Sequence, residues 1–310
     1  MKNSRLFKAE IIALAFVAVL WAVNLRTHCV ARATAGTLRQ VARIAPNSQC
    51  AYELLGSTYL YLGRTDEGEK AYRRAETLAC ERTVKANPTD PDAHYALGDA
   101  YFDQERYEAA VEAYRRSIEL DPNDFMAHYS LGVALDWLDR YEEEVEAFKQ
   151  AIRINPHDVD AHFNLGNAYC NSGKPESAIA VYEKAISLDP EHRESRERLA
   201  DCFWETGQPE RSIETWKQAV ADDPNWEWSH VRLAFDYNDL GRYDESVAAW
   251  KQLIEREPGI AGLHLLLGDT YRATGRDEEA KAAYEQTLAI NPKHEKARQR
   301  LAAMPADHPD

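Results

Sequence analysis

Histidine recurs in this sequence in phase with one fixed interval, and imidazole nitrogens are common metal ligands in proteins. The positions are His94, His128, His162, His230 and His264. A metal ladder would need two imidazoles on one ion, with Zn–N bonds of about 2 Å each. If each histidine belongs to a separate helical unit, equivalent side chains stand one helix diameter, ~10 Å, apart. We therefore predict that these histidines are structural and that they bind no metal.

The other residue types that commonly take part in catalysis do not form any of the known catalytic or metal-binding motifs in this sequence. None of the five cysteines (Cys29, Cys50, Cys80, Cys170 and Cys202) forms a C-x-x-C pair, so zinc and thioredoxin-type redox sites have no support. No glycine-rich phosphate loop, H-E-x-x-H pair or nucleophile elbow is present. Acidic residues are abundant, but periodic carboxylates on helices usually form a solvated face. The sequence predicts no enzymatic activity and no cofactor.

Prolines reveal how the chain is organised. Seven of them follow one another at this same constant interval: Pro88, Pro122, Pro156, Pro190, Pro224, Pro258 and Pro292. Proline blocks the continuation of a helix and biases the preceding residue away from the helical region. Each proline is therefore expected to end one unit and to begin the next.

Within each unit the spacing is typical of two amphipathic helices. The first helix has a large apolar residue, a small one next to it and usually an aromatic four positions on, as in Leu97, Gly98 and Tyr101. A small residue is expected there because two helix backbones cross closely only where no bulky side chain intervenes. The second helix repeats a small residue and an aromatic, as in Ala110 and Tyr114. Glycines that accept the left-handed conformation are expected to end the first helix at Gly173, Gly207, Gly241 and Gly275.

This pattern resembles the tetratricopeptide repeat family, whose units have the same length, about 34 residues. The resemblance covers residues 49–292 in seven units. It implies an all-α fold, namely a right-handed α-solenoid of about seven tetratricopeptide helix-turn-helix repeats, with an N-terminal hydrophobic helix and a C-terminal capping helix. The expected division is a signal-anchor or signal peptide at 1–30, a connecting or capping helix at 31–48, the repeats at 49–292, a capping helix at 293–304 and a tail at 305–310.

Two units depart from the pattern. In the first, the spacing from Pro46 to Pro88 exceeds the common interval by eight positions. The extra residues follow Arg74 and are expected to lengthen the second helix. They should also rotate the side of the helix from which the chain continues into the next unit. In the third, Glu144 replaces the small residue of the second helix.

Cys50 and Cys80 form a candidate disulfide in the first unit. Cys50 opens the first helix and Cys80 lies in the inserted turns, 14 and 16 residues from the turn near Arg64. Because these numbers of residues are similar, the two cysteines should lie at similar positions along the axis of the hairpin. A disulfide between them is then geometrically allowed in an extracytoplasmic protein. Two unpaired thiols on helix surfaces are the alternative.

The resemblance also implies a partner-binding site. Where the family binds extended peptides, one face of each first helix lines a concave groove, and asparagines there hold the ligand backbone. The matching positions are Tyr95, Asp99, Phe102, Tyr129, Trp137, Phe163, Asn164, Asn167, Arg198, Asp201, Trp204, Trp228, Arg232 and Asp269. The run 164–169, Asn-Leu-Gly-Asn-Ala-Tyr, is the closest match to the peptide-holding pattern. An amide both donates and accepts, which suits sequence-tolerant binding of an extended backbone.

Tryptophan has two roles in this interpretation. Trp216 and Trp250 occupy the second-helix aromatic position and are predicted to be core residues. Trp137, Trp204 and Trp228 match groove positions, where ligand binding and packing between helices remain equal alternatives.

The net charge of the chain indicates which kinds of partner it can bind. The net charge is −15, although residues 1–45 carry seven Lys or Arg against one Glu, which leaves −21 for the remainder. An acidic body repels phosphate backbones, so no nucleic-acid partner is expected. The lysines of the family's carboxylate clamp are missing, which disfavours acidic chaperone tails. We expect a basic or neutral client segment, an extended peptide or a helix with apolar anchors, centred on the fourth to sixth units.

The amino terminus resembles a membrane-targeting segment. Lys2, Arg5 and Lys8 precede an apolar run of 13 residues, 11–23, within the range of a signal peptide. Extending the run over residues 6–25 approaches the length of a spanning helix, about 20 residues. We favour an uncleaved anchor, with membrane association through this segment; a cleaved signal peptide and an exported protein are the alternative.

The sequence thus favours a membrane-associated or exported scaffold or adaptor that binds a client segment in its groove. The alternative is a purely architectural subunit of a membrane-associated assembly, built by repeat stacking or self-association. The client and the oligomeric state stay open.

Overall fold

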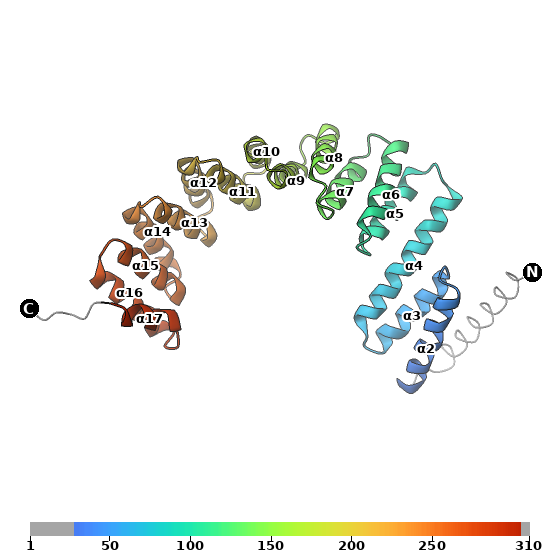
Figure 1. Ribbon diagram of the computed structural model, residues 1–310, viewed down its shortest axis with the longest axis horizontal. Helices are drawn as coiled ribbons and strands as arrows, with labels where there is room; N and C mark the ends of the chain where they lie inside the picture. The colour runs from blue at the N-terminus through green and yellow to red at the C-terminus, as the bar shows by residue number, and fades with distance from the viewer. Residues whose placement is uncertain (1–27, 305–310) are drawn as a thin grey trace, which may run out of the picture. The chain divides into compact units, whose positions relative to one another are not determined.

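The computed structural model describes residues 28–304, and this part of the chain is entirely helical (Figure 1). The prediction of an all-α fold is confirmed for these residues. The expected hydrophobic helix at the amino terminus and the tail at 305–310 lie outside the described residues. Within 28–304, no helix is both long and apolar enough to span a bilayer.

Sixteen helices make up the described chain. They are α2 (His28–Ile44), α3 (Gln49–Tyr61), α4 (Thr65–Ala86), α5 (Pro91–Phe102), α6 (Tyr107–Leu120), α7 (Phe125–Asp136), α8 (Tyr141–Ile154), α9 (Val159–Asn171), α10 (Pro175–Leu188), α11 (Arg193–Glu205), α12 (Pro209–Asp222), α13 (Glu227–Asp239), α14 (Tyr243–Arg256), α15 (Ala261–Ala273), α16 (Asp277–Ile290) and α17 (Glu295–Ala302).

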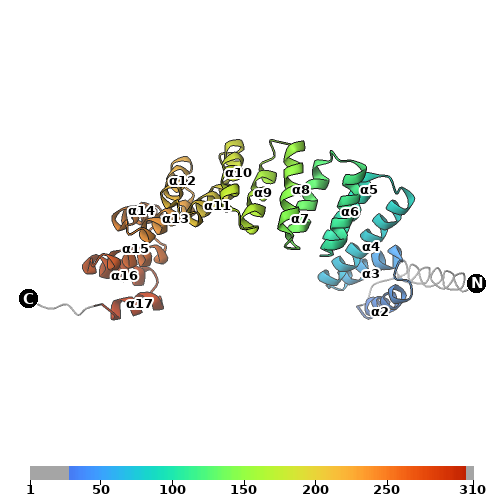
Figure 2. The same ribbon diagram turned by 45° about the horizontal axis from the view of Figure 1, so that its top comes forward.

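Most of these helices form hairpins in which two consecutive helices run antiparallel (Figures 1 and 2). Between 49 and 290 the hairpins are α3–α4, α5–α6, α7–α8, α9–α10, α11–α12, α13–α14 and α15–α16. Six prolines of the periodic series lie in turns between hairpins, and the seventh, Pro292, lies between the last hairpin and α17. None of the seven lies inside a helix. The chain therefore changes hairpin where proline removes the helical hydrogen bond.

The turn inside a hairpin requires a left-handed residue. Five glycines adopt it, with φ between 70° and 72°, including the four predicted to end first helices. Glu105 and Asp139 take the same conformation at φ 59° and 54°, although side chains disfavour it. These two hairpins, α5–α6 and α7–α8, therefore carry backbone strain that glycine would remove.

Where the small residue of a first helix is glycine, it makes room for the aromatic ring of the second helix. A Cβ atom on Gly132 would lie 2.7 Å from Cζ of Phe148, and one on Gly268 would lie 2.6 Å from Cε1 of Tyr284. In the first hairpin the two backbones also approach closely, as expected, since a Cβ atom on Gly56 would lie 3.1 Å from the carbonyl oxygen of Gly68. The second-helix ring lies directly against the glycine.

Most of the periodic histidines, which were predicted to be structural, form hydrogen bonds within the turns between hairpins. In four of them, Nε2 lies 3.0 to 3.2 Å from the carbonyl oxygen of the proline six residues earlier: His94, His128, His230 and His264. Arg196 and Arg298, at the same position of their repeats, donate to the carbonyls of Pro190 and Pro292. This position therefore supplies a donor that closes the turn.

The chain divides into two compact units, and each is described by itself. Unit 1 comprises the described residues up to Ala161, and unit 2 begins at His162. In unit 1, α2 packs on the first hairpin, where Ala35 and Leu38 join a buried cluster with Leu55 and Tyr59. In unit 2, the short α17 covers the last hairpin through Ala297, which is fully buried in the cluster around Trp250 and Tyr284.

The first hairpin has an unusually long second helix. α4 has 22 residues, whereas α6 has 14, which matches the eight extra residues in the sequence. Thr77 lies midway along α4, and its hydroxyl donates to the carbonyl of Ala100 on α5. The next hairpin therefore contacts only part of α4, and the first half of this helix borders a cleft described below.

Candidate partner-binding site

The fourteen predicted partner-binding residues lie on first helices or at their carboxyl ends, and none is buried. Unit 1 holds Tyr95, Asp99, Phe102, Tyr129 and Trp137. Unit 2 holds Phe163, Asn164, Asn167, Arg198, Asp201, Trp204, Trp228, Arg232 and Asp269, which we call the first-helix face. The predicted site is therefore divided over two units.

A tyrosine of the second helix fixes one polar residue of the first helix in three hairpins. The hydroxyls of Tyr114, Tyr182 and Tyr284 each donate a 2.7 Å hydrogen bond to the residue 15 positions earlier: Asp99, Asn167 and Asp269. Burial, with the bond to Asp99, raises the pKa of Tyr114, so the hydroxyl remains a donor. Sequence inspection found both members of these pairs but missed the pairing.

This bond gives Asn167 a defined orientation. Its carbonyl oxygen accepts from Tyr182, so the amide NH₂ group remains for a ligand. The side chain is half-buried, and its position on α9 lies beside Phe163, whose ring is 6.1 Å from that of Tyr182. An oriented amide donor next to an aromatic ring suits a peptide carbonyl flanked by an apolar side chain.

Arg232 links two neighbouring first helices of unit 2. Its guanidinium donates to Oδ1 of Asp201 at 2.6 Å, from α13 to α11. It also lies 5.4 Å from the ring centre of Trp216 and 6.0 Å from that of Trp228. Trp216 is fully buried, as predicted, whereas Trp228 is exposed. The arrangement places an exposed indole beside the Arg232–Asp201 ion pair.

Four of the five predicted residues of unit 1 are aromatic, and each of these contacts another aromatic ring. Trp137 is 61% exposed and stacks on Tyr107, with ring centres 5.3 Å apart and planes inclined by 10°. Phe102 also contacts Tyr107, with ring centres 5.3 Å apart in an edge-on arrangement. Tyr107, at the start of α6, was not predicted, because the sequence pattern assigned ligand contacts to first helices only.

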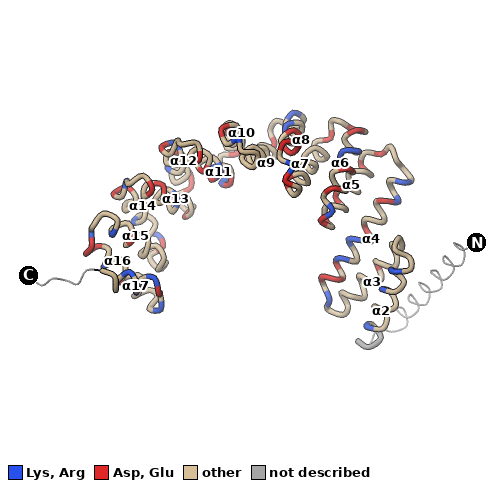
Figure 3. Tube along the Cα trace, in the orientation of Figure 1, with Lys and Arg blue, Asp and Glu red and all other residues tan. Residues whose placement is uncertain are grey.

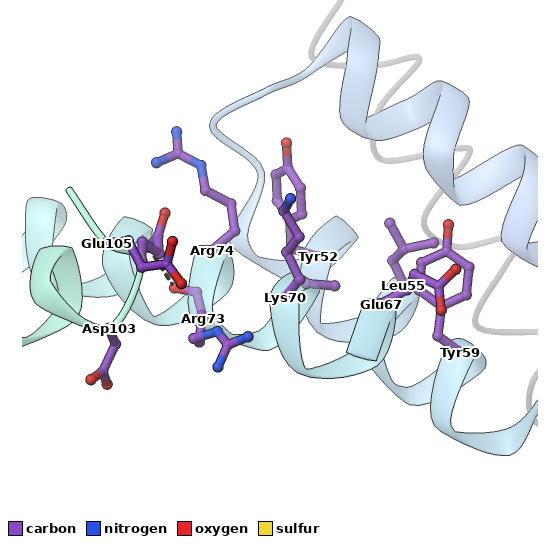
Figure 4. Close-up of a pocket in the computed structure, with 11 residues that line it drawn as sticks. Tyr52, Leu55, Tyr59, Glu67, Lys70, Arg73, Arg74, Asp103 and Glu105 are labelled. Atoms are coloured by element: carbon purple, nitrogen blue, oxygen red, sulfur yellow. Dashed lines mark hydrogen bonds between the residues drawn. The ribbon is translucent and has the colours of Figure 1, made fainter. Parts of the chain in front are cut away.

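Unit 1 also contains a cleft that the sequence did not predict. It has a volume of about 540 Å³ and lies between α3, the first half of α4 and the turn from α5 to α6 (Figure 4). Tyr52, Leu55 and Tyr59 line it from α3, and Asp103 and Glu105 line it from the turn. Gln104 anchors that turn to α4, donating from Nε2 to the carbonyl of Arg73 at 3.0 Å.

The charges around this cleft have both signs. Lys70, Arg73 and Arg74 project from α4 (Figure 4). Arg74 lies 3.7 Å from Glu81, while Lys70 and Arg73 have no ion-pair partner among residues 28–304. Such a lining suits an amphipathic segment that carries charges of both signs.

Glu144 is buried in unit 1 at the place where other hairpins have glycine, alanine or serine. It is only 2% exposed, and Oε2 has no hydrogen-bond partner in the described chain. Burial, reinforced by the negative charge of Asp136, raises the pKa of Glu144 to about 8. The sequence showed the substitution but not its electrostatic consequence.

The candidate disulfide between Cys50 and Cys80 is not made in the structure, where both are free thiols. Cys50 is exposed on α3. Cys80 is half-buried, and burial raises the pKa of its thiol, with a contribution from Asp99 on α5.

Comparison with known proteins identifies the repeat. Family models described as "TPR repeat" or "Tetratricopeptide repeat" match residues 51–79, 79–112, 98–135, 138–173, 159–192 and 232–295. No curated protein matches the sequence.

Many solved structures are similar to this chain. The crystal structure of MamA is 25% identical, with a TM-score of 0.45 over 55% of this chain and 95% of that one. The pilF protein of Pseudomonas aeruginosa is 18% identical, with a TM-score of 0.47 over 68% and 96%. The structure of Naa15/Naa10 bound to HypK-THB is 17% identical, with a TM-score of 0.55 over 99% and 45%, which indicates a shared fold.

Proposed function

Because this chain belongs to the tetratricopeptide repeat family, whose repeats serve as protein–protein interaction scaffolds, we propose that it binds a client protein segment on the first-helix face of unit 2. The client is a basic or neutral segment with apolar anchors, in an extended or helical conformation. Arrays of this kind generally act by binding rather than by catalysis, since they present long side-chain surfaces on stacked repeats.

The observation that carries this proposal is the orientation of Asn167. Tyr182 occupies the amide carbonyl, so the NH₂ group is set to donate to a ligand carbonyl before any ligand arrives. A donor that is already oriented loses little rotational freedom on binding, which favours affinity. Asn164 lies one helical turn away on the same helix and is also half-buried.

The neighbouring side chains supply the remaining contacts. Arg198 on α11 is exposed, and Trp228 on α13 offers an indole face to an apolar or cationic side chain. Asp201 already accepts from Arg232, so its charge is only partly available. The face therefore combines one side-chain amide that can donate to a peptide carbonyl, one exposed aromatic ring and charges of both signs.

The charge of the whole chain favours a basic or neutral client over an acidic one. The net charge is −15, and acidic residues occur along most helices, as Figure 3 shows for each unit. An acidic surface attracts cationic segments and repels anionic ones at low ionic strength. We expect affinity for a basic client to fall as salt increases.

The test uses short random peptides displayed on phage and selected on the full-length protein. We expect selected peptides to be rich in Lys or Arg and in apolar residues. A fluorescein-labelled selected peptide is then titrated against the wild type and against a variant in which Asn164, Asn167 and Arg198 are all replaced by Ala. Binding should be lost in the triple variant, while its helicity and Tm stay close to those of the wild type.

A matched control changes exposed residues of the second helices in the same unit. Glu183, Lys184 and Gln218 are exposed on α10 and α12, and their replacement by Ala should leave the affinity unchanged. If the Asn164, Asn167 and Arg198 variant binds the peptide as tightly as the wild type, the first-helix face is not the binding site.

If the triple variant binds the peptide as tightly as the wild type, the better description is an architectural subunit of a larger assembly. A subunit that assembles by repeat stacking or by self-association would show a concentration-dependent mass in sedimentation equilibrium. The exposed Trp137 of unit 1 is the first residue to replace in that case, because exposed aromatics are enriched at protein interfaces.

We also propose membrane association through the amino-terminal segment, with residues 1–30 as a signal-anchor, 31–48 as a connecting helix, 49–292 as the repeats and 293–304 as the cap. The basic residues and the apolar run of the sequence support this proposal. Cell fractionation and intact-mass measurement test it. A mature chain that starts near Gly36 would show a removed signal peptide and an exported protein instead.

A further inference from the structure

Two thiols from neighbouring hairpins lie in direct contact in unit 2. Sγ of Cys170 on α9 is 3.2 Å from Sγ of Cys202 on α11, and the two residues are 32 positions apart. Cys170 is half-buried, while Cys202 is only 2% exposed. One sulfur is therefore accessible to a small reagent, and the other lies directly behind it.

The repeat geometry produces this contact. Two repeats further on, Asn238 on α13 and Thr270 on α15 occupy the equivalent positions, and Nδ2 of Asn238 donates to Oγ1 of Thr270 at 3.1 Å. Side chains at these two positions thus face each other wherever first helices of adjacent hairpins pack in this way. The proximity of Cys170 and Cys202 follows from the fold, not from one chance rotamer.

The surroundings divide the two sulfurs into a nucleophile and a resolving thiol. The hydrogen bond from Cys202 lowers the pKa of Cys170 to about 7, with smaller help from the hydroxyl of Tyr182 and from the charge of Arg198. The same bond and burial raise the pKa of Cys202. A thiolate near neutral pH at the accessible position is the arrangement that thiol–disulfide exchange requires.

A metal site fits these residues less well. Structural zinc sites use four ligands, and no group of three His, Cys, Asp or Glu side chains lies within coordinating distance in the described residues. A disulfide needs only the two sulfurs, which must approach by about 1 Å to reach a bond length of about 2.05 Å.

We propose that Cys170 and Cys202 form a reversible disulfide that joins α9 to α11, with a low-molecular-weight disulfide such as glutathione disulfide as the oxidant. The Cys170 thiolate attacks one sulfur of glutathione disulfide, the S–S bond breaks, and one glutathione leaves as a thiolate. Cys202 loses its proton to solvent and attacks Sγ of Cys170, and the second glutathione leaves. Two protein thiols are oxidised to one disulfide, and one glutathione disulfide is reduced to two glutathione molecules.

The test equilibrates the full-length protein in glutathione buffers of rising oxidised-to-reduced ratio, blocks free thiols by alkylation and identifies the peptides by mass spectrometry. We expect a linked peptide pair that contains Cys170 and Cys202 and has lost two hydrogen atoms. Its abundance should rise with the ratio and return to zero on reduction. Alkylation of both cysteines at every ratio would overturn the proposal, and so would a glutathione adduct on Cys170 that never converts into the internal bond.

Single variants separate the two roles. In Cys202→Ser, the glutathione adduct on Cys170 should accumulate, because no thiol remains to displace it. In Cys170→Ser, the adduct on Cys202 should form at least tenfold more slowly, since Cys202 is buried and its thiol is protonated. Equal rates in the two variants would contradict the assignment of Cys170 as the nucleophile.

A positive control uses the equivalent pair two repeats away. Asn238→Cys with Thr270→Cys, in a chain that also carries Cys170→Ser and Cys202→Ser, should form a bridge under the same oxidising buffers. If this engineered pair oxidises while Cys170 and Cys202 remain reduced in the native chain, the native thiols only pack together and the proposal fails.

Discussion

The hydroxyl of Tyr182 on α10 donates a hydrogen bond to Oδ1 of Asn167 on α9, at 2.7 Å. Tyr114 and Asp99 make the same bond in unit 1. A second-helix side chain with no direct access to the client face therefore sets the orientation of a residue on that face. The two equivalent bonds allow the contribution to stability to be separated from the contribution to binding.

Tyr182→Phe should lower the free energy of unfolding by about 1 kcal/mol, the usual net value of a neutral hydrogen bond. It should also weaken the binding of the selected peptide, because the amide of Asn167 is no longer held in one orientation. Urea unfolding and peptide titration measure the two effects. Tyr114→Phe serves as the control, with an equal or larger loss of stability, because its acceptor is a carboxylate, and with unchanged affinity. An unchanged affinity in Tyr182→Phe would mean that the orientation of Asn167 is irrelevant.

Glu144 predicts an unusual pH dependence in unit 1. Because its folded pKa is raised from 4.5 to about 8, the native state retains a proton that the unfolded state releases between these values. The free energy of unfolding should therefore fall as pH rises from about 4.5 to about 8 and change no further above that through this group, with an upper bound of about 5 kcal/mol.

Replacing Glu144 by Ala, the residue of equivalent hairpins, should remove this slope and stabilise the protein at pH 8. Urea unfolding at a series of pH values measures it. Glu146→Ala, on the exposed side of α8, should retain the slope. Parallel pH profiles for the wild type and Glu144→Ala would show that the carboxyl group is ionised in the native state.

Glu105→Gly should stabilise unit 1, because Glu105 holds a φ of 59° that glycine adopts without a steric penalty. The expected gain is about 1 kcal/mol. The opposite exchange at a natural glycine turn, Gly207→Ala at φ 72°, should cost about the same amount. Thermal unfolding of both variants provides the measurement, and a lower Tm for Glu105→Gly would contradict the assignment of strain.

Two glycines of α15 offer a matched test of ring packing. A Cβ atom on Gly268 would lie 2.6 Å from the ring of Tyr284, whereas one on Gly262 meets nothing within 4 Å. Gly268→Ala should therefore destabilise the last hairpin by about 1–3 kcal/mol. Gly262→Ala should be neutral or stabilising, since alanine favours helix. Equal effects on Tm would show that the ring of Tyr284 moves aside freely.

The periodic features of this fold were predictable from the sequence, because they repeat. Proline at every turn, glycine at most hairpin ends and the buried places of Trp216 and Trp250 each follow from a local rule applied seven times. The left-handed conformation of Glu105 and Asp139 was not predicted from their residue types, although their alignment with the glycines of other repeats contained the signal.

Features that depend on pairs of residues were harder to predict. The bond from Tyr182 to Asn167 joins two helices, and the sequence showed its members only as separate patterns. The contact between Cys170 and Cys202 was missed because cysteine spacing was compared with short motifs, whereas the relevant spacing is set by the repeat. The cleft lies beside the lengthened helix α4, whose extra length could be read from the sequence, whereas its packing against the α5–α6 turn could not.

The bond that closes the turns between hairpins has a consequence for acid tolerance. The ring nitrogen Nε2 of His94, His128, His230 or His264 can donate to the proline carbonyl both as the neutral Nε2–H tautomer and as imidazolium. Arginine, which fills the same place at 196 and 298, remains a donor at any pH that the protein meets. At His230, burial lowers the pKa of the imidazole, and Nδ1 has no hydrogen-bond partner in the described chain. Acidification should therefore weaken the turn before α13, whereas the turns closed by arginine at 196 and 298 should keep their bonds.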